Sequence, residues 1–231
     1  MTETVPLEAQ VDSPEAKRTA PLSPFAEAGT VALATVTAPL EWPKPDWIVM
    51  EMSSYQIESA HDVKPTIGIW TTLTPDHLER HGSIDAYREI KKGLLQRSKH
   101  VVLNADDADL QSRHAQWPEA QWVSSANKKH EPSNLELWVN PEGFVCNNKG
   151  SLFPANALAM PGEHNRQNML LVTAAALLAG LKASAIEGGM RSFPGVPHRL
   201  ESVGSLHGMN VFNDSKATNY DAAAVALQAV P

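Results

Sequence analysis

Short apolar runs alternate with helix-type segments between residues 46 and 114, and this alternation constrains the fold more than any other feature of the chain. The runs Trp47–Met50, Thr66–Leu73 and Val101–Leu103 are short and mostly apolar. Such runs are typical of strands buried on both faces of a parallel sheet. Strands that alternate with helices predict an α/β fold with a mainly parallel central sheet flanked by helices.

Three helices are expected between and after these strands. Each has a Ser or Asp near its start that can accept a hydrogen bond from the unpaired backbone N–H groups of the first turn. The longest one places its apolar residues on a single face. The expected helices run from Ser53 or Ser54 to Ala60, from Ser83 or Asp85 to about Ser98, and from Asp106 to His114.

The second half of the chain predicts further short strands and then helices. A last strand pair and a helix capped by Asn219 are typical of the start of another α/β domain, which has no room to finish before Pro231. The expected strands are Gln121–Val123, Leu135–Val139, Phe144–Cys146, Leu200–Val203 and Met209–Phe212, with turns at Pro141–Gly143 and His207–Gly208, and the expected helices are Asn165 to about Leu178 and Ser184–Arg191.

Composition and charge exclude several classes of protein. A single cysteine, Cys146, excludes an internal disulfide and a multi-cysteine metal site. A net charge of −7 argues against non-specific nucleic-acid binding. The longest apolar stretch, Met169–Leu181, is too short to span a bilayer, and no secretory signal follows Met1. We therefore expect a cytoplasmic protein with no nucleic-acid or membrane partner.

Residues 1–45 differ from the rest of the chain. They contain seven of the 17 prolines together with many Ala, Thr, Ser and Glu residues. Such a segment contributes little to a core, and it predicts a low-order N-terminal region. One short strand is expected within it, between Val31 and Val36.

Three residues near the first two expected strands could hold a cation. Glu51 directly follows one strand, and His77 directly follows the next. The carboxyl ends of parallel strands meet at one edge of a sheet, where ligands gather. A carboxylate there is well placed to bind a divalent cation, and Lys91 lies in the helix that follows. Taken singly, the three are equally consistent with a solvated glutamate, a structural histidine and a surface lysine.

Two polar groups later in the chain could bind a nucleotide. Asn165 and Asn168 lie three residues apart on one helix face, and their amides could read a purine edge. His198-Arg199 and the loop Asn213–Asn219 could bind phosphate, ribose hydroxyls or a carboxylate. A helix cap at Asn165 and a solvated loop are the alternatives. The phosphate-binding patterns GxxxxGK[ST] and GxGxxG do not occur in the sequence.

The order and spacing of the polar motifs together resemble the Mur ligase family, from about Asp46 to Pro231. The resemblance implies that residues 46–200 form the central ATPase domain without its GTNGKST phosphate loop. It also implies that residues 201–231 begin a truncated, Rossmann-like C-terminal domain for amino-acid binding. The motifs are Glu51–Gln56, Thr74–His77, Tyr87–Lys91, Asn104–Asp107, Gly162–Asn168, Pro197–Arg199 and Asn213–Asn219.

The resemblance also implies roles for single residues. Glu51, His77 and Lys91 match magnesium ligands, with Lys91 carbamylated in a complete enzyme. Lys91, His77 and Arg199 match catalytic residues. Asn165, Asn168, Arg199 and Asp214 match ATP contacts, and Ser53, Gln56, Lys216 and Thr218 match substrate contacts.

The implied reaction is ATP-dependent ligation of D-glutamate to UDP-N-acetylmuramoyl-L-alanine in peptidoglycan synthesis, through an acyl phosphate. Mg²⁺ would be the cofactor, ATP a co-substrate and the complete enzyme a monomer. Because the phosphate loop is missing, we expect the isolated chain to be inactive. A non-catalytic nucleotide-binding fragment is one alternative. The other is an amide ligase similar to folylpolyglutamate synthetase, against which the Asn213–Asn219 stretch argues.

Overall fold

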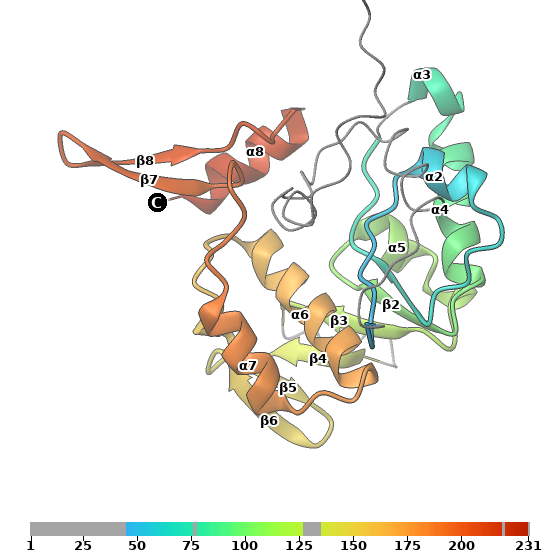
Figure 1. Ribbon diagram of the computed structural model, residues 1–231, viewed down its shortest axis with the longest axis horizontal. Coiled ribbons are helices and arrows are strands. Elements are labelled where there is room, and N and C mark those ends of the chain that lie inside the picture. Colours follow the sequence, from blue (N-terminus) through green and yellow to red (C-terminus); the bar gives the residue numbers. More distant parts are fainter. Residues whose placement is uncertain (1–44, 76–77, 127–134, 219, 231) are drawn as a thin grey trace, which may run out of the picture. The chain divides into compact units, whose positions relative to one another are not determined.

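A computed structural model describes residues 45–75, 78–126, 135–218 and 220–230 (Figure 1). The chain divides into two compact units, residues 1–50 and residues 51–231. The predicted low-order segment, including its strand between Val31 and Val36, lies outside the described residues except for Pro45. The domain boundaries after residues 45 and 200 stay predictions.

The strand predicted at Trp47–Met50 is wrong. Residues 45–50 contain no strand, and the side chains of Ile48 and Val49 are 75% and 99% exposed. A strand forms only where a neighbouring strand pairs with its backbone N–H and C=O groups. Within the described residues, these six find no such neighbour, so their apolar composition alone does not produce a strand.

A six-stranded sheet forms the centre of the second unit. Its strands follow the order of the chain, the first four are parallel, and the last two are antiparallel to their neighbours. This arrangement confirms the predicted mainly parallel sheet with flanking helices. The strands are β1 (Ile67–Trp70), β2 (His100–Asn104), β3 (Gln121–Ser124), β4 (Leu135–Val139), β5 (Phe144–Asn147) and β6 (Gly150–Pro154).

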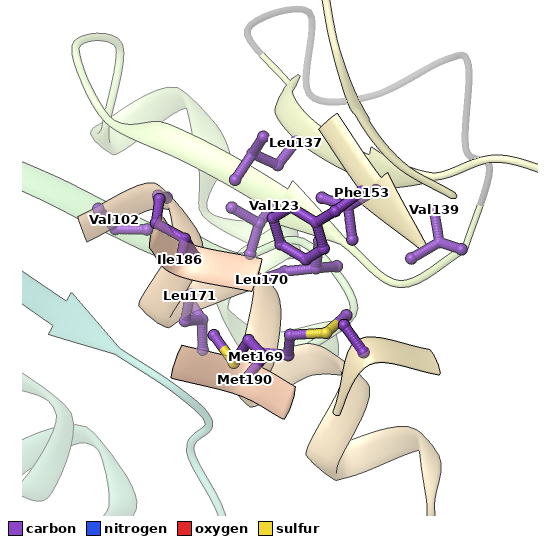
Figure 2. Close-up of a cluster of buried hydrophobic side chains, with 13 residues drawn as sticks. Val102, Val123, Leu137, Val139, Phe153, Met169, Leu170, Leu171, Ile186 and Met190 are labelled. Atoms are coloured by element: carbon purple, nitrogen blue, oxygen red, sulfur yellow. The ribbon is translucent and has the colours of Figure 1, made fainter. Parts of the chain in front are cut away.

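Alternating residues of the central strands enter two separate cores. Val102 and Val123 belong to a core that includes residues of α6 (Glu163–Leu178) and α7 (Ala183–Ser192), as Figure 2 shows. Their neighbours Leu103 and Trp122 belong to a second core. Successive side chains of a strand point to opposite faces of a sheet. The strands are therefore buried on both faces, as their apolar composition predicts.

The cap predicted at Ser83 is confirmed, whereas the helix predicted from Asp106 to His114 is observed only as α5 (Ala108–Ser112). Ser83 caps α4 (Ile84–Gln96) by accepting a hydrogen bond from the N–H of Ala86 at 3.1 Å. Asp107 caps the short α5 in the same way, from the N–H of Leu110 at 2.9 Å. The other short helical segments described in the second unit are α2 (Ser54–Ser59), α3 (Leu78–His81), and the 3-10 turns η2 (His114–Gln116) and η3 (Ala155–Ala157).

The last part of the second unit contains a hairpin and a helix. β7 (Glu201–Leu206) and β8 (Met209–Asn213) form a separate antiparallel pair, which confirms the strands predicted there. The turn between them has positive φ at both His207 and Gly208, the geometry that matches the twist of a two-residue hairpin. α8 (Tyr220–Ala229) follows, and the predicted cap Asn219 lies outside the described residues. None of the helices described has both the length and the apolar character that crossing a bilayer would require.

Candidate functional site

The segment Asn104–Asp107 links the loops that follow the parallel strands. Asp107 accepts hydrogen bonds from the Thr72 hydroxyl at 2.6 Å and from the Leu73 N–H at 3.0 Å, both just after β1. Asp106 accepts a bond from the Ser124 hydroxyl at 2.6 Å, at the end of β3. These carboxylates therefore fix the carboxyl edge of the sheet, where ligands gather in parallel sheets.

Asn104 extends this network to the helix α6. Its amide nitrogen donates to the carbonyl of Thr71 at 2.9 Å and to the side-chain oxygen of Gln167 at 3.1 Å. Asn104 is 2% exposed, and a buried amide needs such partners. The network thus connects the end of β1, the end of β2 and the first turns of α6. The sequence pattern alone assigns no role to Asn104.

Ser53 and Gln56, the two predicted substrate contacts near Glu51, form a capping box at the start of α2. The Gln56 side chain accepts from the Ser53 backbone N–H at 2.8 Å, and the Ser53 hydroxyl accepts from the Gln56 N–H at 3.3 Å. Both side chains lie at the surface. The cap explains these residue types on structural grounds, and their contact with a substrate stays a prediction.

The predicted metal ligands are only partly described. Glu51 is exposed, and Lys91 is half-buried on α4 with its ammonium nitrogen 5.0 Å from the centre of the Tyr87 ring. His77 lies outside the described residues. Among the residues that are described, no group of three His, Cys, Asp or Glu side chains could hold a metal ion. The set Glu51, His77 and Lys91 as magnesium ligands stays a prediction.

The start of α6 differs from its predicted form. Gly162 occupies the N-cap position with φ 99°, and Asn165 lies within the first turn instead of capping the helix. The Asn165 amide is buried and donates to the Pro161 carbonyl at 2.6 Å. Asn168 is exposed. Asn165 therefore holds the loop before α6, whereas the Asn168 amide is open to solvent, and the contact of either residue with ATP stays a prediction.

The structure brings together the segments around Arg199 and Asp214. Asp214 accepts a hydrogen bond from the Leu200 N–H at 3.0 Å, and the Lys216 N–H donates to the His198 carbonyl at 3.1 Å. Asn213 also pairs with the His198 ring at 2.8 Å. Two segments that are separate in the sequence thus form one polar site.

The backbone on either side of Arg199 is strained. His198 has φ 66° and Leu200 has φ 47°, a region that residues other than glycine rarely adopt. Such conformations persist only where surrounding contacts hold them, and they cluster at functional sites. The hydrogen bonds of Leu200 to Asp214 and of His198 to Lys216 stabilise this backbone conformation. The turn thus holds the backbone at Arg199 in place, and the Arg199 side chain is exposed.

His164 joins the start of α6 to this polar site. Burial lowers the pKa of its imidazole below the usual value, and the charge of Asp214 opposes part of that shift. A side chain added at Gly162 would come within 2.7 Å of both His164 and Ala229 of α8. Sequence patterns did not single out His164, because nothing in its spacing shows that Asp214 is near.

The lowered pKa predicts a pH dependence of stability. The unfolded chain binds a proton at His164 more readily than the folded chain does, so this residue contributes less stability as pH falls through about 6.5, the ordinary histidine value. We expect His164→Gln to lose less stability than the parent chain between pH 7.5 and pH 5.5. Urea unfolding at both values measures this, with His114→Gln, at an exposed position, as control.

A cleft of about 960 Å³ opens beside the start of α6. Its lining includes Asn140, Asn156, Arg166 and Arg191. The predicted ATP contacts Asn168, Arg199 and Asp214 do not line it. The cleft and the polar site around Arg199 are therefore distinct parts of this unit.

A profile of the Mur ligase middle domain matches residues 30–176. The chain belongs to the Mur ligase family. The motifs from Glu51–Gln56 to Gly162–Asn168 lie within the matched residues.

Relatives of high identity are cyanobacterial proteins with one name, UDP-N-acetylmuramoylalanine--D-glutamate ligase. One from Parasynechococcus marenigrum is 61% identical over 186 residues, covering 80% of this chain and 40% of the relative. One from a Synechococcus strain is 62% identical over 188 residues, covering 81% and 41%. This Mur ligase chain thus spans about two fifths of the length of these relatives.

Solved Mur ligase structures share the fold at low identity. MurF from Acinetobacter baumannii has a TM-score of 0.59 and 18% identity, covering 75% of this chain and 39% of that one. MurC from Thermotoga maritima has a TM-score of 0.57 and 23% identity, covering 74% and 39%. These structures confirm the α/β fold.

Proposed function

We propose that this chain forms the ATP-binding part of a ligase that joins D-glutamate to UDP-N-acetylmuramoyl-L-alanine in peptidoglycan synthesis. The observation that carries the proposal is the identity of 61–62% to D-glutamate ligases across about four fifths of the chain. The reaction would pass through an acyl phosphate, formed when the substrate carboxylate attacks the γ-phosphate of ATP.

The polar site around Arg199 and Asp214 suits a nucleotide. A guanidinium pairs well with phosphate, and a carboxylate that accepts one backbone N–H keeps further acceptor capacity for ribose hydroxyls. Asn168 adds an amide that could read a purine edge. A MurF from Thermotoga maritima with this fold, at a TM-score of 0.52 and 16% identity, was solved in complex with ADP. We place ATP at this site, with Lys216 and Thr218 toward the substrates.

A magnesium site at Glu51, His77 and Lys91, with Lys91 carbamylated, belongs to the same proposal. Mg²⁺ would neutralise charge on the transferring phosphoryl group when bound. The role of this chain would be to supply Glu51 from the segment just before α2 and Lys91 from α4. Ser53 and Gln56 would face the muramoyl substrate from the start of α2.

The second candidate is a nucleotide-binding chain without catalysis. It is favoured by the absence of a GxxxxGK[ST] pattern from the 231 residues, since that loop cradles the β- and γ-phosphates in ATPases that contain it. With ATP, Mg²⁺ and both substrates, we expect the purified chain to release no phosphate above background. Robust turnover that depends on D-glutamate would contradict this expectation.

A chimera separates the two candidates. Residues of this chain replace the 186 matched residues of the Parasynechococcus ligase, and purified protein is assayed for incorporation of labelled D-glutamate with ATP. The proposed function predicts ligation that requires D-glutamate and the muramoyl substrate together. A folded chimera that binds ADP but ligates nothing would favour the non-catalytic reading. L-glutamate and glycine serve as the control amino acids.

A further inference from the structure

His81 lies at the end of the short helix α3 and contacts the helix that follows Glu51. Its ring nitrogen Nε2 is 2.9 Å from the hydroxyl oxygen of Ser54 in α2, a hydrogen bond between residues 27 positions apart. Ser54 is 2% exposed. The Tyr55 ring lies 5.5 Å from the His81 ring, at a tilt of 58°. The imidazole is thus fixed from the α2 side by a buried hydroxyl and an aromatic ring.

His81 also contacts the helix that carries Lys91. Its ring stacks on the Tyr87 ring, with centroids 5.3 Å apart and an interplanar angle of 25°. Tyr87 is 8% exposed, and the Lys91 ammonium nitrogen lies 5.0 Å from the centre of the same ring. A cation at this distance from an aromatic ring is attracted to it. Tyr87 therefore contacts both the imidazole and the amine.

Three helices thus meet at one histidine. α2 begins three residues after Glu51, α3 begins directly after His77 in the sequence, and α4 carries Lys91. His81 is in α3 and contacts α2 and α4. A single side chain therefore connects the elements that follow or carry the three proposed metal ligands.

We propose that His81 is a positioning residue for Lys91. The hydrogen bond to Ser54 fixes the orientation of the His81 imidazole. The imidazole stacks on the Tyr87 ring and fixes the orientation of that ring, and the ring in turn fixes the position of the Lys91 amine. His81 acts through Tyr87 and need not touch a substrate. The proposal rests on the proposed function, which gives Lys91 its task, but its test needs no ligase activity.

The test follows the Lys91 side chain by NMR in the full chain labelled with ¹³C-lysine. The aromatic ring of Tyr87 should displace the Lys91 ε-methylene signal from the values of the other lysines, and the loss of that signal in Lys91→Arg assigns it. We expect His81→Ala to lose most of this displacement and Tyr87→Leu to lose all of it. His81→Phe, which keeps a ring but not the bond to Ser54, should retain an intermediate displacement. His114→Ala, at an exposed histidine, should leave the signal unchanged.

Folding is checked separately, by the amide signals of the β2 and β3 strands in each variant. A displaced Lys91 signal that persists in folded His81→Ala, while Tyr87→Leu abolishes it, would overturn the proposal. If His81→Ala does not fold, His81→Phe and Ser54→Ala decide the question. Both variants remove the hydrogen bond between residues 54 and 81. If the Lys91 signal in both variants stays where it is in the parent chain, the proposal is equally overturned.

Discussion

The Arg88→Ala variant should unfold with a free energy about 3 kcal/mol smaller than that of the parent chain. Arg88 on α4 is 8% exposed and donates two parallel hydrogen bonds to Asp109 of α5, at 2.9 and 2.7 Å. A third bond joins it to Asp85. The bonds to Asp109 raise the pKa of Arg88, so the guanidinium stays charged. Its removal leaves the Asp109 carboxylate, only 22% exposed, without its main partner. This value is the lower end of the range for breaking a buried ion pair, because the Asp109 carboxylate remains partly solvated.

Arg166→Ala is the matched control, because it removes an arginine from an exposed pair. Arg166 and Glu163 lie 3.1 Å apart with side chains 48% and 55% exposed. Such pairs contribute little, so the loss should stay below about 0.5 kcal/mol. Arg88→Lys should be intermediate, because lysine keeps the charge but not the two parallel bonds. Equal losses in urea unfolding for Arg88→Ala and Arg166→Ala would show that the link between α4 and α5 is unimportant.

Lys91→Ala in the ligase chimera should lower the rate of D-glutamate ligation at least about 100-fold, the scale of losing one group that stabilises transition-state charge. As a carbamate, Lys91 would supply an anionic oxygen ligand, the type that Mg²⁺ prefers. Alanine supplies none. Initial rates at saturating substrates measure the effect, and short-chain carboxylic acids added to the assay should restore part of the rate.

Lys92→Ala is the control for this experiment. Lys92 is the next residue on α4, and it pairs with Glu89 at 3.4 Å. Its replacement should leave the ligation rate unchanged. A rate in Lys91→Ala close to that in Lys92→Ala would return Lys91 to the class of ordinary surface lysines.

Local chemistry made much of the fold predictable. The caps predicted at Ser53 and Ser83 follow from side chains that accept backbone N–H bonds, and both are observed. The apolar character of the central strands indicated burial on both faces, which the two cores confirm. These features depend on residues close together in the sequence.

The failures depend on partners distant in the sequence. Trp47–Met50 has the composition of a buried strand, but pairing requires a neighbour, and composition does not show whether one exists. β6 was missed because Gly150–Pro154 is neither alternating nor continuously apolar, and its pairing with β5 specifies it.

The candidate site shows the same limit. The polar character of the segments near Arg199 and Asp214 was readable, and their direct contact follows from the hairpin β7–β8 that joins them. The contacts of His81 and His164 were not readable, since their partners lie 27 and 50 positions away. Long-range contacts of single histidines leave no local pattern.

The measurement that tests this account most directly is a titration of the isotope-labelled chain with ATP, followed by backbone amide NMR. We predict weak binding, with a Kd of about 1 mM. The signals that move should belong to His164, Asn168, His198–Leu200 and Asn213–Ala217, and Asp214→Asn should weaken the response. Signals that move only around the cleft lined by Asn140 and Arg191, or that do not move at all, would contradict the placement of ATP at the Arg199 site.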